Sequence, residues 1–123
     1  MTTRVLLIDD SRAAQHIFQR YIETTSEFEL VGIASNGAEG IRLYQELKPD
    51  LVCLDILMPD MDGIQVLRSL KNLDNKVKVI IITSLGSQAD KVVEFLKMGA
   101  LSVLSKPFDS NTLIEQLRRA IKL

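Results

Sequence analysis

The chain has 123 residues, of which 46% are hydrophobic and 25% charged, and its formal net charge is -1. These values predict one domain with a substantial buried core, and they give nucleic-acid binding no support. The single cysteine, Cys53, excludes a disulfide within the chain, and no hydrophobic run approaches the ~20 residues of a membrane span. The chain does not begin with a signal-peptide pattern, so we expect a cytoplasmic protein with no membrane partner.

Hydrophobic runs of strand length recur along the whole chain. They cover residues 5–8, 28–34, 51–54, 77–83 and 100–104. The first and third runs are continuously apolar, which is typical of strands buried on both faces of a parallel sheet. The fourth run is rich in β-branched residues and gives the strongest strand signal. The sequence therefore predicts five strands.

Helical periodicity follows each of these runs. The apolar positions at helical spacing lie within residues 14–22, 38–47, 64–70, 92–96 and 113–121. Asp10 or Ser11 can cap the first helix, and Asp109 or Ser110 the last. Pro49 is expected to end the second helix at about residue 48.

Alternating strands and helices favour one architecture. Because a crossover between parallel strands is almost always right-handed, five such units give a doubly wound α/β fold with helices on both faces. We predict a five-stranded parallel sheet of flavodoxin-like order 2-1-3-4-5. Residues 1–123 would form a single domain, with no internal repeat and no output domain.

Polar side chains fall where the predicted strands end. Asp9 and Asp10 close the first strand, Asp55 the third, Thr83 the fourth and Lys106 the fifth. Parallel strands bring these ends to one edge, and in the predicted order the first and third strands are neighbours. Three clustered carboxylates suit a hard divalent ion such as Mg²⁺. With a lysine and a hydroxyl beside them, the set predicts a site for a metal and an anion, of which a phosphoryl group is the natural candidate.

The chain resembles the receiver domains of response regulators, in particular the single-domain regulators of chemotaxis, over essentially its whole length. The matching segments are residues 6–10, 49–55, 58–63, 82–83, 99–100 and 106–108. Each segment is weak evidence by itself, but together they occur in order and at the predicted strand ends. The resemblance is therefore specific.

The resemblance implies a role for each acidic residue. Asp55 would be the phosphoacceptor, forming an aspartyl phosphate with a phosphoryl group from a histidine kinase. Asp10 would ligate Mg²⁺ directly, and Asp9 would act through water or by tuning the site. Asp55 itself and the backbone carbonyl of Leu57 would complete the protein ligands.

The same resemblance gives roles to the other strand ends. Lys106 would pair with the phosphoryl oxygens, and the Lys106–Pro107 peptide bond is expected to be cis. Thr83 would hydrogen-bond the phosphoryl group, with Ser84 as the alternative hydroxyl. Val103 stands where the family often has an aromatic residue, so the readout of phosphorylation cannot be an aromatic flip.

The implied function is two-component signalling by a protein that is not an enzyme beyond its own phosphorylation and dephosphorylation. A histidine kinase or histidine phosphotransferase would donate, and a separate downstream protein would receive the signal from a monomer or a phosphorylation-dependent dimer. Apolar Leu57 and Leu85 flank the site and cannot orient a water, so we expect slow dephosphorylation.

Two other functions compete with this reading. The first is an Mg²⁺-dependent phosphatase or phosphotransferase that acts on small phosphoesters through an aspartate nucleophile. Such enzymes generally need a second acid and a cap over the substrate, and the sequence has no insertion that could form a cap. The second is a phosphorylation-independent scaffold of the same fold. The strand-end residues that phosphorylation would need are all present, which argues against a scaffold: Asp10, Asp55, Thr83 and Lys106.

Overall fold

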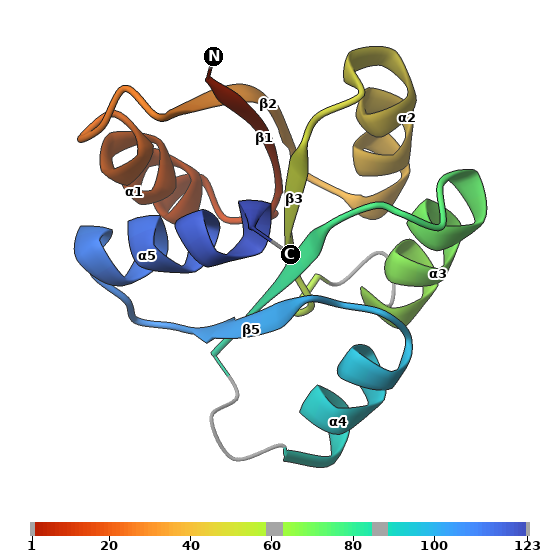
Figure 1. The fold of residues 1–123 in the computed structure, drawn as a ribbon. Helices are drawn as coiled ribbons and strands as arrows, with labels where there is room; N and C mark the ends of the chain where they lie inside the picture. The colour runs from red at the N-terminus through yellow and green to blue at the C-terminus, as the bar shows by residue number, and fades with distance from the viewer. Residues whose placement is uncertain (1, 59–62, 85–88, 123) are drawn as a thin grey trace.

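The structure is a computed structural model that describes residues 2–58, 63–84 and 89–122 (Figure 1). Strands and helices alternate along it, as predicted. In chain order they are β1 (Thr3–Ile8), α1 (Arg12–Ile22), β2 (Phe28–Ala34), α2 (Gly37–Leu47), β3 (Leu51–Asp55), α3 (Gly63–Leu73), β4 (Val79–Thr83), α4 (Ala89–Lys97), β5 (Ser102–Ser105) and α5 (Ser110–Ile121).

The strands form one parallel sheet of order β2-β1-β3-β4-β5, which confirms the predicted fold class and strand order. Helices α1 and α5 cover one face of the sheet, and α2, α3 and α4 cover the other (Figure 1). β3 lies at the centre, and all of its residues are buried. A strand enclosed in this way must be apolar, which explains the continuous hydrophobic run of its sequence.

Successive side chains of a strand point to opposite faces, so each strand contributes to two cores. In β1, Leu6 and Ile8 pack with α2 and α3, whereas Val5 and Leu7 pack with α1 and α5. Both cores reach the carboxyl edge of the sheet. They therefore hold the ends of β1 and β3 rigidly at the point where the polar residues begin.

The structure decides between the alternative helix caps. Ser11 Oγ accepts a hydrogen bond from the Ala14 amide, and Asp109 Oδ1 accepts one from Thr112. Ser11 and Asp109 are therefore the N-caps of α1 and α5. α2 ends at Leu47, and its C-cap Lys48, in the left-handed conformation (φ 47°), lies immediately before Pro49.

Two strands start later than the sequence predicts. β4 begins at Val79 because the Val77 amide bonds the Asp74 carbonyl in a turn after α3. β5 begins at Ser102, and the amide of Ala100 is used to close α4 by bonding the Phe95 carbonyl. In both cases a helix end takes hydrogen-bonding groups that the hydrophobic pattern assigns to a strand.

Gly40 packs α2 tightly against the sheet. A Cβ atom at this position would lie 2.5 Å from Cδ1 of Ile8. We expect Gly40→Ala to lower the free energy of unfolding by about 1–3 kcal/mol through overpacking, although alanine favours a helix by about 1 kcal/mol. Chemical denaturation measures this change.

A double-mutant cycle provides the control for Gly40→Ala. Ile8→Val removes Cδ1, the nearest of the three Ile8 atoms that the new methyl group would meet, and leaves Cγ1 and Cγ2 at 2.8 and 3.1 Å. The destabilisation by Gly40→Ala should therefore be smaller in the Ile8→Val background. Equal losses in both backgrounds would rule out this contact as the cause.

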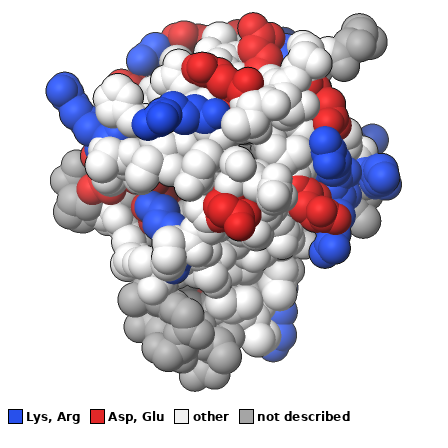
Figure 2. Space-filling model, turned by 90° about the vertical axis from the view of Figure 1, so that its left-hand side faces the viewer, with Lys and Arg blue, Asp and Glu red and all other residues white. Residues whose placement is uncertain are grey.

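Charges of both signs lie side by side on the face that carries α1 and α5 (Figure 2). Arg118 on α5 and Glu27, which precedes β2, form an ion pair. Hydrogen bonding from Arg118 lowers the pKa of the Glu27 carboxyl.

Within the described residues, none of the helices has the length and hydrophobicity needed to cross a membrane.

Candidate functional site

The acidic site is built by two neighbouring strands, β1 and β3. Ile8 is paired with Leu54, so the next residues, Asp9 and Asp55, lie side by side at the carboxyl edge of the sheet. Asp9 is 1% exposed and Asp55 4% exposed, whereas the adjacent Asp10 is exposed to solvent. One carboxylate oxygen from each of the three residues lies within 4.8 Å of the others. The structure thus brings together the three acids that the sequence places at strand ends.

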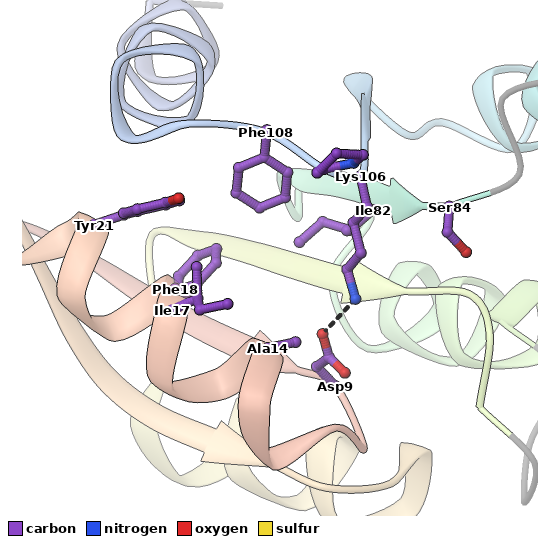
Figure 3. A pocket seen from close by; sticks show the side chains of 10 residues that line it. Asp9, Ala14, Ile17, Phe18, Tyr21, Ile82, Ser84, Lys106 and Phe108 are labelled. Carbon is purple, nitrogen blue, oxygen red and sulfur yellow. Dashed lines mark hydrogen bonds and ion pairs between the residues drawn. The ribbon is translucent and has the colours of Figure 1, made fainter.

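Hydrogen bonds fix the orientation of the two buried carboxylates. Oδ1 of Asp9 accepts from the Ser11 amide at 2.9 Å, and Oδ1 of Asp55 accepts from the Leu57 amide at 2.8 Å. The Oδ2 atoms of both residues accept from Nζ of Lys106, at 3.0 and 2.9 Å. Lys106 therefore bridges Asp9 and Asp55 (its bond to Asp9 is drawn in Figure 3).

The end of β5 positions Lys106. Ser105 is paired with Thr83, and the Lys106 amide donates to the Thr83 carbonyl at 2.7 Å. The Lys106–Pro107 peptide bond is cis, as predicted. The Lys106 ammonium thus reaches the ends of β1 and β3 from the edge strand of the sheet.

The electrostatic environment perturbs both partners of the ion pair. Burial raises the pKa of the Asp55 carboxyl and the charge of Asp9 raises it further, against the hydrogen bonds from Leu57 and Lys106. Burial by itself would lower the pKa of Lys106, but its hydrogen bonds to Asp55 and Asp9 outweigh that effect and raise it. Lys106 is therefore a cation at neutral pH.

The raised pKa of Asp55 predicts how stability depends on pH without Mg²⁺. A raised pKa means that protonation of Asp55 favours the folded state, so this contribution is present in acid and is lost as the pH rises through the raised pKa. As the pH rises from about 3 to about 7, we expect the unfolding free energy of Asp55→Asn to increase relative to that of the unmodified chain. Urea denaturation at several pH values measures the difference. A difference that stays constant over this range would contradict the expectation.

The donor set fits a divalent metal ion. Three carboxylates and one ammonium leave two negative charges, which one divalent cation balances. All the side-chain ligands are oxygens and Asp10 faces solvent, an arrangement that suits Mg²⁺ with several retained waters. Leu57 contacts Asp55 through its amide, and the role of its carbonyl as a ligand stays a prediction.

Both candidate hydroxyl residues lie at the end of β4. Thr83 is the last residue of the strand and 2% exposed, whereas Ser84 is exposed and lines a cavity beside Lys106. The choice between the two hydroxyls therefore stays open. Val103 is half-buried on β5, opposite Ile81. Leu85, predicted to flank the site, lies outside the described residues.

A largely apolar cavity of about 380 Å³ adjoins the acidic site (Figure 3). It lies between α1 and the segment after β5, where the rings of Tyr21 and Phe108 meet edge to face at 6.2 Å. Asp9 and Lys106 belong to its lining. Ile17 belongs to the apolar positions that the sequence pattern places on one side of α1, yet it lines the cavity and is 48% exposed. Sequence reasoning missed the cavity because periodicity does not tell how closely two faces pack.

Fold and site together define a flavodoxin-like α/β protein with an acidic, lysine-bridged centre at the switch point of its sheet. The family model of the response regulator receiver domain matches residues 5–118, and the chain belongs to this family.

Known relatives agree with this assignment. The chain is 38% identical over 122 residues to chemotaxis protein CheY of Thermotoga maritima, which covers 99% of this chain and 100% of that protein. It is 34% identical over 121 residues to chemotaxis protein CheY of Bacillus subtilis, covering 98% of this chain and 99% of that protein. The chain is thus a receiver domain of the CheY type, a signalling domain of two-component systems.

Solved structures of receiver domains have the same fold. The response regulator domain of Thermotoga maritima CheB is 29% identical and superposes with a TM-score of 0.91, covering 100% of this chain and 98% of that one. A chain of the CheX–CheY–BeF3–Mg²⁺ complex from Borrelia burgdorferi is also 29% identical, with a TM-score of 0.90 and coverage of 97% and 89%.

Proposed function

We infer that the chain is a response regulator that accepts a phosphoryl group on Asp55 with the help of Mg²⁺. The observation that carries the proposal is the bridge from Lys106 to Asp9 and Asp55 at the ends of adjacent strands. It supports a site in which Asp55 would be the nucleophile, Lys106 the cation for phosphoryl oxygens and the clustered acids the metal ligands. Family membership supports the same chemistry.

The reaction is a transfer between two nucleophiles. A carboxylate oxygen of Asp55 forms a bond to phosphorus while the bond from phosphorus to the donor breaks, and the electron pair leaves with the donor atom. Asp9, Asp10 and Asp55 would hold Mg²⁺, which when bound would neutralise negative charge on the phosphoryl oxygens.

Lys106 would change partners during the transfer. Before it, the ammonium bonds Oδ2 of Asp55 at 2.9 Å. Once Asp55 becomes an acyl phosphate, its carboxyl group is no longer charged. The negative charge then lies on the phosphoryl oxygens. Lys106 is therefore expected to bond phosphoryl oxygens, while the Leu57 amide can stay on the carbonyl oxygen of Asp55. This exchange starts the change that a partner would detect.

The donor would be a histidine kinase or a histidine phosphotransferase, and the receiver of the signal a separate protein. The Borrelia burgdorferi complex contains CheY with CheX, and the relatives are chemotaxis proteins, so regulation of motility is the favoured setting. A cytoplasmic location, a monomer or phosphorylation-dependent dimer, and slow loss of the phosphoryl group are part of the proposal.

Intact mass spectrometry after incubation with acetyl phosphate and Mg²⁺ tests the proposal. We expect one added phosphoryl group that is lost on treatment with hydroxylamine and absent when a chelator removes Mg²⁺. After removal of the donor, the adduct should decay slowly. No adduct despite measurable Mg²⁺ binding would refute acceptance from this donor, and steady release of phosphate without an adduct would favour a phosphatase.

A further inference from the structure

Gln15, on α1, connects two loops at the carboxyl edge of the sheet. Its side-chain Nε2 donates to the backbone carbonyl of Asp9 at 2.6 Å and contacts Oγ of Ser35 at 3.2 Å. Gln15 is half-buried, and its amide lies between the end of β1 and the residue that follows β2. The sequence pattern gave this residue no role, because it lies beside the apolar stripe of α1.

The hydrogen bond from Gln15 fixes the peptide group that joins Asp9 to Asp10. The amide of Asp9 is already held by the Ala34 carbonyl at 2.9 Å, and its carboxylate by Ser11 and Lys106. The bond to the Asp9 carbonyl completes this set. The Asp10 side chain is attached directly after that peptide group. Within the described part of the chain, the Asp10 carboxylate makes no hydrogen bond or ion pair. The position of the Asp10 carboxylate thus depends on the backbone.

The other end of the connection, at Ser35, is also held by hydrogen bonds. The Ser35 amide donates to Oε1 of Glu39 at 2.9 Å, and Asn36 caps α2 by accepting from the Glu39 amide. Because β1 lies between β2 and β3, Gln15 braces the β1 end from the side opposite Asp55. Gln15 can therefore position Asp9 and Asp10 without touching Asp55, the proposed phosphoacceptor.

We propose that Gln15 is a positioning residue for the metal site: its hydrogen bonds to the Asp9 carbonyl and to Ser35 hold the Asp10 carboxylate at the distance from Asp55 that Mg²⁺ requires. The inference rests on the proposed function, since it presupposes that Asp9, Asp10 and Asp55 bind Mg²⁺. Residues that orient metal ligands by hydrogen bonding commonly change metal affinity when replaced. We expect the Kd for Mg²⁺ to rise about tenfold without the Gln15 amide.

Calorimetric titration with Mg²⁺ alone tests the inference, on the full chain and on two variants. Gln15→Met removes the amide but keeps the side-chain length and a similar helix propensity. Gln19→Met makes the same change one turn later on α1, where the side chain is exposed. The Kd should rise in the first variant and stay unchanged in the second.

A merely structural role for Gln15 would lower stability without changing Mg²⁺ affinity, so two further readouts separate the roles. Urea denaturation without Mg²⁺ should show that both methionine variants are folded, with Gln15→Met less stable only by the loss of its two hydrogen bonds. The rate of phosphorylation by acetyl phosphate should need more Mg²⁺ in Gln15→Met but reach the same maximum.

An unchanged Kd in a folded Gln15→Met variant would overturn the inference and leave the phosphoacceptor proposal intact. If that variant does not fold, Ser35→Ala tests the same connection from its other end, and an unchanged Kd there would likewise overturn it. If the unmodified chain itself fails to bind Mg²⁺, the metal site and the inference both fall.

Discussion

Replacing Asp55 with asparagine is expected to abolish the phosphoryl adduct completely. An amide oxygen carries no full negative charge and cannot form the acyl phosphate, so no other part of the site can compensate. The variant should remain folded, because the single asparagine oxygen can still accept one of the two hydrogen bonds that Leu57 and Lys106 donate to the carboxylate. Intact mass after incubation with acetyl phosphate and Mg²⁺ measures the result.

Asp50→Asn provides a matched control for Asp55→Asn. Asp50 is exposed, lies at the opposite end of β3 and accepts a hydrogen bond from the Arg4 amide, which an asparagine oxygen can also accept. This control should gain one phosphoryl group, as the unmodified chain does. An adduct on Asp55→Asn would contradict the assignment, and peptide mapping would then identify the true acceptor.

Replacing Lys106 with methionine is expected to destabilise the protein strongly when Mg²⁺ is absent. The ammonium bonds two carboxylates that are 1% and 4% exposed, and its removal leaves both without a cation. Removing one partner of a buried pair typically costs 3–5 kcal/mol, and because the Lys106 side chain is 25% exposed we expect a loss of about 3 kcal/mol in unfolding free energy. Urea denaturation in the presence of a chelator measures it.

Two comparisons identify the cause of that loss. Lys97→Met removes an exposed lysine from α4 and should change the stability little. In the Asp55→Asn background, Lys106→Met should cost less, because only one carboxylate, that of Asp9, then loses its cation. Mg²⁺ should stabilise Lys106→Met more than the unmodified chain, since it supplies the missing positive charge. Equal stability of Lys106→Met and the unmodified chain would show that the ion pairs contribute no net free energy.

The sequence by itself determined the fold and the approximate place of the site. Continuous apolar runs at residues 5–8 and 51–54 predict strands buried between two layers of helices, and the right-handed crossover limits the strand orders that the chain can adopt. All strand ends must meet at one edge, so Asp9, Asp55 and Lys106 could be placed together before any distance was known. These inferences depend on hydrophobic periodicity and chain connectivity, which are local properties of a sequence.

Only the tertiary structure decided which of the strand-end residues are buried and which partners they contact. Asp9 and Asp10 are equivalent in the sequence, yet one is buried against Lys106 and the other faces solvent. Lys106 and Asp9 are 97 residues apart, and Gln15 reaches Ser35 from another element. Contacts of this kind depend on which way each backbone turns after its strand and on how closely the helices pack. No local sequence pattern encodes these contacts. The ion pairs of Lys106, the cavity and the hydrogen bonds of Gln15 to Asp9 and Ser35 therefore appear only when the chain is folded.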